Sequence, residues 1–226
     1  MAKRTTAPAK WTATPAKAAV PWRSWVSVIL VGALLFLAGY LIGRPSSVQQ
    51  DADQIRQADA ARDKAQVADL TTLARTTRDQ LMPVLTRMAT AMPVDPAKAP
   101  QPAAAADVAG WQQAADKAVA AFADPPSGAT ATNVARGGFT AAVNQIGSAV
   151  KTYTLSLTAD PAAQKELREL AGRQRTNAVA TWSVASTQLD QVNIDAGYGH
   201  QHVFLPADPG SGAFTSDGSP EGSGSR

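Results

Sequence analysis

The sequence has no cysteine and only two histidines among its 226 residues. The missing thiols exclude a disulfide-linked scaffold, a zinc site built from cysteines, and thiol chemistry. Aromatic residues make up only 6% of the chain, whereas alanine alone contributes 47 residues, close to half of the apolar set. Sandwiches and barrels are enriched in aromatic and β-branched side chains. The composition therefore argues against a β fold.

The chain also lacks a basic surplus on its central part, although its formal net charge is +3. Residues 1–24 contain five basic residues and no acidic one, whereas residues 45–204 contain 14 basic and 15 acidic residues. A nucleic-acid interface requires basic side chains gathered on the folded domain. We therefore expect no nucleic-acid partner.

Sequence motifs for catalysis and nucleotide binding are missing as well. The chain contains no P-loop, Gly-x-Gly-x-x-Gly, Gly-x-Ser-x-Gly or His-Glu-x-x-His motif. The carboxylate pair Asp59 and Asp63 lies beside Arg56 and Arg62, a mixture of charges typical of a solvated helix face. We expect no enzymatic activity, no cofactor and no metal site.

One long apolar run stands out, the uncharged 19 residues from Trp25 to Gly43. A helix of this length spans roughly 28 Å, close to the thickness of the hydrocarbon core of a bilayer. Arg23 and Arg44 flank the run, and aromatic residues lie near both of its ends. We predict a single transmembrane helix over residues 23–44, with the lipid bilayer as its surroundings.

The charge distribution predicts the orientation of this helix. Its basic, acid-free side precedes it, which places the N-terminus in the cytoplasm and residues 44–226 outside. The run is longer than the apolar region of a cleaved signal peptide, and no good small-x-small cleavage site follows it. An uncleaved anchor is the preferred interpretation, and cleavage remains the alternative.

Three glycines of the apolar run share one helical face, namely Gly32, Gly39 and Gly43. Gly39 and Gly43 form a small-xxx-small pair, which allows two membrane helices to approach closely. We consider them candidates for packing in a homodimer or against another span. The alternative is that glycine is simply common in membrane helices.

Beyond residue 45, apolar residues recur every three or four positions, which predicts helices over about 46–92, 107–122, 133–157 and 160–195. The first of these is weakly amphipathic in its first half, which suggests a stalk, and contains Pro83, which should kink or restart it. The apolar residues of the third predicted helix have the most regular spacing. They are Phe139, Val143, Ile146, Val150, Tyr153 and Leu157.

The predicted fold class is all-α: one N-terminal transmembrane helix followed by an alanine-rich antiparallel bundle of about four helices. Trp111 and Trp182 lie on apolar stripes and are expected in its core. Both termini, rich in small and polar residues, are expected to be disordered. The expected parts are a basic cytoplasmic tail (1–22), the membrane helix (23–44), the stalk and bundle (45–204) and a Gly/Ser-rich tail (205–226).

The segment after the last predicted helix contains more aromatic residues than is usual for a disordered tail. We select Tyr198, His200, His202 and Phe204 as candidate partner-docking residues, although packing of residues 203–205 against the bundle is the simpler interpretation. A His-x-His pair also suggests a metal site. Two ligands alone do not make a selective site, and no third is evident in the sequence.

Together these features predict a non-enzymatic interaction or structural protein of the cell envelope, anchored by one span and contacting a protein partner or a second copy of itself. The abundance of Ala and the excess of Arg over Lys are compatible with a bacterial source. The alternative is a sensory protein whose helical ectodomain binds a small ligand and signals through a separate membrane partner. An envelope enzyme is a third, less favoured hypothesis.

Overall fold

The computed structural model describes residues 22–43, 47–124, 126 and 128–224. All regular secondary structure in these residues is α-helical, which confirms the all-α prediction. The N-terminal tail up to residue 21 and the predicted helix start at residue 46 lie outside the described residues. The five helices are α1 (Trp22–Ile42), α2 (Ser47–Ala91), α3 (Ala105–Ala121), α4 (Thr130–Ser156) and α5 (Pro161–Asp195).

The chain forms two compact units, residues 1–54 and residues 55–226. The first contains α1, whose span Trp25–Ile42 is long and apolar enough to cross a membrane and is also of the kind found in a signal sequence. None of this span is buried. Among the described residues, the apolar side chains of α1 are therefore exposed.

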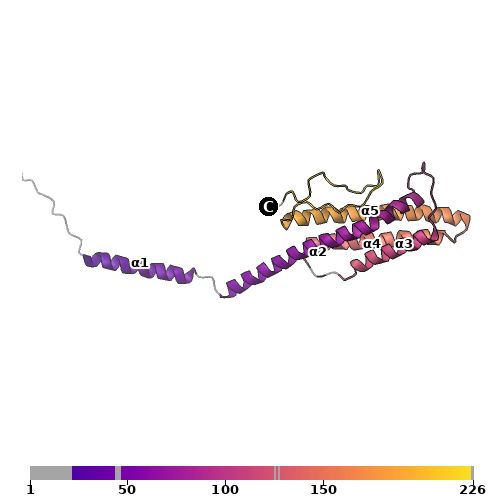
Figure 1. The fold of residues 1–226 in the computed structure, drawn as a ribbon. Helices are drawn as coiled ribbons and strands as arrows, with labels where there is room; N and C mark the ends of the chain where they lie inside the picture. The colour runs from indigo at the N-terminus through magenta and orange to yellow at the C-terminus, as the bar shows by residue number, and fades with distance from the viewer. Residues whose placement is uncertain (1–21, 44–46, 125, 127, 225–226) are drawn as a thin grey trace, which may run out of the picture. The chain divides into compact units, whose positions relative to one another are not determined.

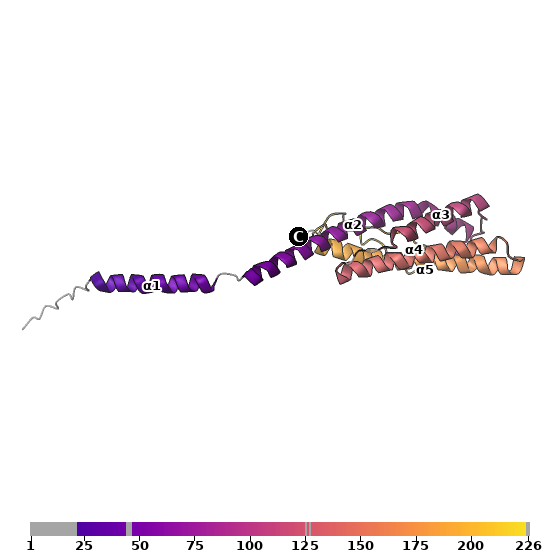
Figure 2. The same cartoon turned by 90° about the horizontal axis from the view of Figure 1, so that it is seen from below.

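Helices α3, α4 and α5 and the later part of α2 share one hydrophobic core in the second unit. Helices α4 and α5 lie side by side in both views (Figures 1 and 2), and only four residues connect them, so they run in opposite directions. In α2, burial begins at Gln66 and Val67, so the first half of this helix is largely exposed, as its weak amphipathic pattern predicts.

Aromatic rings occupy the centre of this core. The rings of Phe139 and Trp182 meet edge to face, with their centroids 4.6 Å apart, and those of Trp111 and Tyr153 lie 5.4 Å apart. The expected core positions of Trp111 and Trp182 are confirmed, since both are at most 2% exposed. Much of the remaining core is alanine, which lets the helices approach closely.

Helices α4 and α5 approach each other closely at Gly138, where a side chain would not fit without a shift. A Cβ there would lie 2.8 Å from the Cβ of Ala185, whereas a Cβ at the adjacent Gly137 would meet nothing within 4 Å. We expect Gly138→Ala to lower the free energy of unfolding by about 1–3 kcal/mol through overpacking. Gly137→Ala should raise it by about 0.5–1 kcal/mol, because alanine favours the helix.

Both substitutions are measured by chemical denaturation of the full-length chain in detergent, followed by circular dichroism. Gly137→Ala is the matched control, since it makes the same chemical change one residue away. Shifts of the same sign in both variants would contradict the close approach of α4 and α5 at this point.

Helix α5 begins as its sequence predicts. The side chain of Asp160 accepts hydrogen bonds from the backbone N–H groups of Ala162 and Ala163, and Pro161 occupies the first helical position. The helix extends to Asp195, where its predicted end lies. The ends of this helix could be predicted from the sequence because capping depends only on neighbouring residues.

Two local predictions differ from the structure. Pro83 does not restart the helix, because α2 runs from Ser47 to Ala91, and Leu81 and Val84 are buried in the core on either side of the proline. The alternative, a kink at Pro83, stays a prediction. Helix α3, predicted from about residue 107, begins two residues earlier, at Ala105. The carboxylate of Asp107 therefore lies in the first turn, 3.2 Å from Nη1 of Arg87.

The C-terminal segment 196–224 differs most from the prediction, which made residues 205–226 a disordered tail. It contains no helix, yet it folds back along α5. The buried guanidinium of Arg175 pairs with Asp208, and the backbone N–H of Phe214 donates to Oγ of Ser183 at 2.9 Å. The composition of the segment is that of a flexible tail, but a few of its residues find specific partners on α5.

The start of this segment is the part most firmly packed. Val203 is completely buried and Leu205 is 5% exposed, as the simpler interpretation of this segment predicts. The carbonyl oxygen of Val203 accepts a hydrogen bond from Nε1 of Trp182 at 2.6 Å and another from Oγ of Ser186 at 3.2 Å. The core tryptophan of α5 therefore also fixes the returning chain.

Candidate functional site

A sharp reversal of the chain after α5 creates the candidate site. Gly197 and Gly199 have φ angles of 79° and 69°, a left-handed conformation that glycine adopts without strain. A Cβ at Gly199 would lie 2.2 Å from the carbonyl oxygen of Gly222, so no larger residue fits there. The reversal directs residues 200–204 back along the last turns of α5.

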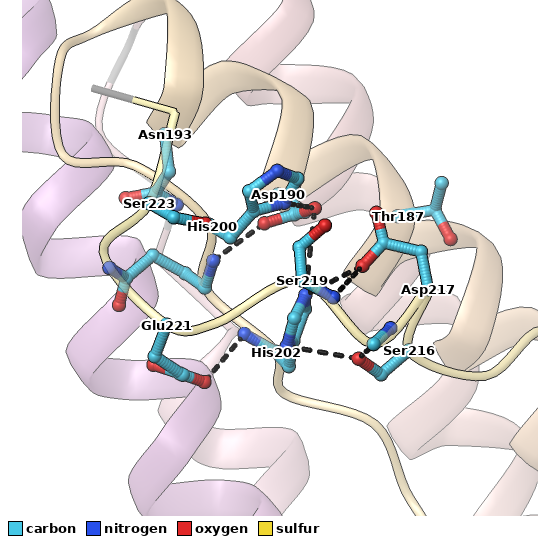
Figure 3. A network of polar contacts seen from close by, with 12 residues as sticks. Thr187, Asp190, Asn193, His200, His202, Ser216, Asp217, Ser219, Glu221 and Ser223 are labelled. Carbon is cyan, nitrogen blue, oxygen red and sulfur yellow. Dashed lines mark hydrogen bonds and ion pairs between the residues drawn. The ribbon is translucent and has the colours of Figure 1, made fainter.

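His200 and His202 meet the carboxylate of Asp190 at this place (Figure 3). His200 Nδ1 lies 2.8 Å from Asp190 Oδ2, and His202 Nε2 lies 4.0 Å from the same oxygen. The two imidazole rings are 5.7 Å apart, because alternate residues of an extended segment lie on the same side. The three side chains are 14–18% exposed.

The last part of the chain covers this group from the other side. His200 pairs through its backbone with the segment ahead of the C-terminus: its N–H donates to the carbonyl of Ser223 at 2.8 Å, and its own carbonyl accepts from Gly222 at 2.9 Å. The turn at residues 216–219 brings Asp217 Oδ1 to 3.4 Å from His202 Nε2. We call Asp190, His200, His202 and Asp217 the His–Asp cluster.

The two nitrogens of His202 have different surroundings. Nδ1 lies 3.0 Å from Oγ of Ser216, within hydrogen-bonding distance. Nε2 is fully buried and has no hydrogen-bond partner, although carboxylate oxygens of Asp190 and Asp217 lie within 4.0 Å of it. A buried polar nitrogen without a partner is costly and calls for an explanation.

Backbone hydrogen bonds also hold the carboxylates of Asp190 and Asp217 in place. Asp190 Oδ1 accepts the backbone N–H of Gln201 at 2.5 Å, which leaves Oδ2 for the histidines. The backbone N–H of Ser219 holds the pKa of the Asp217 carboxyl below its usual value. Desolvation opposes this shift, and the Ser219 side chain and the charges of His200 and His202 add to it. A lowered pKa keeps this carboxylate ionised beside the histidines.

The structure divides the four candidate docking residues. His200, His202 and Phe204 follow one another along one side of the extended segment, with the rings of His202 and Phe204 6.2 Å apart. Tyr198 is directed instead toward α2, where its hydroxyl lies 3.3 Å from the carbonyl of Lys64. His200 and His202 belong to the His–Asp cluster and Phe204 lies beside it, and docking of a partner there stays a prediction.

Sequence reasoning missed both carboxylates of the cluster. The acidic residue nearest to the histidines along the chain, Asp195, is exposed and accepts a hydrogen bond from Gln191. Asp190 lies ten residues before His200 and Asp217 lies 15 residues after His202. The spacing by itself contains no signal for them, because their meeting depends on the reversal and on the folded-back tail.

The candidate packing glycines lie on α1 and at its end. Gly32 and Gly39 have open space where a Cβ would lie. The backbone N–H of Gly43 donates to the carbonyl of Gly39 at 2.8 Å, so Gly43 closes the last turn. Their packing against another membrane helix stays a prediction.

Ser216, His202 and Asp217 contain the residue types of a hydrolase triad. The backbone N–H of Gly218, however, donates to Oγ of Ser216 and so stabilises the turn itself. A serine nucleophile also requires donors directed at the developing oxyanion. The arrangement is better explained as a turn in which Ser216 orients the ring of His202.

Two surface clefts border the proline-rich segment between α2 and α3. One, of about 670 Å³, lies between this segment and the start of α5, and its lining includes Lys98, Lys165 and Arg168. The other, of about 920 Å³, lies between the same segment and residues 208–211. Both are formed by exposed loops and helix surfaces, away from the His–Asp cluster.

The chain matches no protein-family model, no curated protein and no solved structure.

Proposed function

We propose that this chain is a single-pass membrane protein of the bacterial cell envelope, anchored by α1. The observation that carries the proposal is the exposure of an apolar helix: Leu30, Leu35 and Phe36 are 59–76% exposed, and none of the span Trp25–Ile42 is buried. Water-exposed apolar surface of this extent requires a cover. The 21 residues of α1 would extend for about 32 Å, which fits the hydrocarbon core of a bilayer.

The proposal places the N-terminus in the cytoplasm and the helical domain outside. The five basic residues before and at the start of α1, with no acidic residue among them, support this orientation. In this arrangement α2–α5 act as an antiparallel bundle that contacts a partner protein or a second copy without catalysing a reaction. A largely apolar, alanine-rich core suits such a structural role.

Cysteine accessibility tests anchor and orientation together, because the natural chain has no cysteine that would react. Thr14→Cys reports on the N-terminal side and Val184→Cys, at an exposed position of α5, reports on the domain. In intact cells, a membrane-impermeant maleimide should label the Val184→Cys chain and spare the Thr14→Cys chain until the cells are permeabilised.

The opposite labelling pattern would overturn the orientation. A mature chain that lacks residues 22–43 by mass, or that leaves the membrane on carbonate washing, would make α1 a signal sequence or an ordinary soluble helix.

Crosslinking from Val184→Cys in membranes tests whether the helical domain contacts a partner: a discrete crosslinked product supports the interaction. Failure of several exposed positions of α2–α5 to give any adduct would contradict it.

The cleft beside Pro161 favours a second candidate function, a sensory module. Its volume of about 670 Å³ falls within the range of small-ligand sites, and basic side chains dominate its charged lining. An anionic ligand held there would bridge the proline-rich segment and α5. Protection of residues 93–100 and 161–173 from hydrogen exchange by such a ligand would favour this candidate over a purely structural role.

A further inference from the structure

We propose that the His–Asp cluster binds one divalent transition-metal ion, with zinc as its reference ion. Asp190 Oδ2, His200 Nδ1 and His202 Nε2 would supply three ligands and Asp217 Oδ1 the fourth. The Asp190, His200 and His202 donor atoms lie within 4.8 Å of one another. This inference goes beyond the proposed membrane anchoring and does not depend on it.

The distances between the donor atoms fit tetrahedral coordination. Zinc binds histidine nitrogen and carboxylate oxygen at about 2.0–2.2 Å, which places neighbouring ligand atoms roughly 3.3–3.6 Å apart. The three distances along the cluster are 2.8 Å (His200 to Asp190), 4.0 Å (Asp190 to His202) and 3.4 Å (His202 to Asp217). Shifts of less than one ångström would bring these three pairs to the required spacing. Asp217 is not in the group of donor atoms that all lie within 4.8 Å of one another, so the turn at residues 216–219 would also close over the ion.

The kinds of donor atoms select the class of metal. Two imidazoles with two carboxylates suit zinc, copper, nickel and cobalt, whereas magnesium and calcium prefer sites made of oxygen atoms. Asp190, His200 and His202 are largely buried, which limits competition from water. Only Asp217, at 58% exposure, faces the solvent, so it would close the site from outside.

The surroundings of His202 Nε2 provide an independent observation. This buried nitrogen has no hydrogen-bond partner, and two carboxylates lie on the side that it faces. When Nδ1 donates its hydrogen to Ser216, the lone pair of Nε2 is directed toward negative oxygens. A cation between them turns that repulsion into coordination.

Outer hydrogen bonds fix the ligands in the way that metal sites usually require. Ser216 holds the other nitrogen of His202, the backbone of Gln201 holds the second oxygen of Asp190, and the backbone of Ser219 holds Asp217. A proton on His200 Nδ1 would be donated to Asp190 Oδ2, which lies 2.8 Å away, and the ion would take the place of that proton. The ligands are therefore oriented before a metal arrives.

The position of the cluster indicates what the ion would do. Its ligands come from α5, from the extended segment after it and from the turn at residues 216–219, so one ion would connect three segments. Four protein ligands leave no open position for a substrate, which is the pattern of a structural site. The metal would fasten the C-terminal segment to α5.

The test uses the full-length chain in detergent, cleared of metal with a chelator and titrated with zinc sulfate against a chromophoric competitor. We expect one zinc ion per chain and a higher melting temperature with zinc. His202→Asn should weaken zinc binding by about 100-fold or more and remove the thermal shift. Asp195→Asn, an acidic residue of the same helix outside the cluster, is the matched control and should bind like the natural chain.

Two further variants keep the outcome independent of folding. Asp217→Asn changes an exposed side chain and should weaken zinc binding by about tenfold, and Ser216→Ala should do so by about 10–100-fold through loss of the outer hydrogen bond. Bound cobalt should show the intense visible absorption of a tetrahedral site. Equal zinc binding by the natural chain and by His202→Asn, or an octahedral cobalt spectrum, would overturn the proposal, as would equal competition by magnesium.

Discussion

Trp182→Ala is expected to lower the free energy of unfolding by about 3–5 kcal/mol, the largest loss from any single core truncation proposed for this chain. The indole is completely buried and its ring meets that of Phe139 edge to face. Its removal leaves a large cavity between α4 and α5. It also deprives the carbonyl of Val203 of its shorter hydrogen bond, although Ser186 still donates to it.

Trp182→Phe separates these two contributions. Phenylalanine keeps most of the packing but cannot donate to Val203, so the expected loss is about 1–2 kcal/mol. Val184→Ala, at a position of α5 that is 56% exposed, is the control and should change stability by less than about 0.5 kcal/mol. Denaturation of the full-length chain in detergent measures all three. A loss below 1 kcal/mol for Trp182→Ala would show that this core is not packed as described.

The second large effect is expected at α1, where Leu34→Asp combined with Leu35→Asp should move the chain out of the membrane fraction. Each aspartate near the middle of a span costs roughly 3–4 kcal/mol relative to leucine on insertion scales. The pair therefore costs about 6–8 kcal/mol. Both leucines are about two-thirds exposed, so the change disturbs no packing within the protein.

The matched control replaces the same two leucines by isoleucine, which preserves the apolar surface. Fractionation of cells and carbonate washing of their membranes measure the distribution of each chain. A chain with both aspartates that still sediments with the membranes and resists carbonate would mean that α1 is not the anchor.

The helices were predictable because their signals are local. Spacings of three and four residues predicted the buried stripes of α2–α5, and Asp160 with Pro161 identified the start of α5 to the residue. The continuous helix through Pro83 was less predictable. There the burial of the neighbouring residues outweighs a local preference for a break.

The His–Asp cluster could be predicted only in part. The His200-x-His202 spacing drew attention to the right segment, because alternate residues of an extended chain share a side. Asp190 and Asp217 join it through contacts between distant parts of the chain, and the Gly/Ser-rich composition of the tail indicated disorder rather than docking. A few specific partners, such as Arg175 for Asp208, decide the position of a segment whose average composition predicts none.

The hydrogen bond from Trp182 to the carbonyl of Val203 has a practical consequence. It joins an indole to the start of the returning C-terminal segment, so the fluorescence of this tryptophan would change if the segment left α5. Trp111 is the other buried tryptophan in the described part of the chain, and Trp22 and Trp25 are exposed on α1. With those three and Trp11 replaced by phenylalanine, Trp182 would be the only tryptophan left and would serve as an optical probe of whether the C-terminal segment is in place, with no label added to the protein.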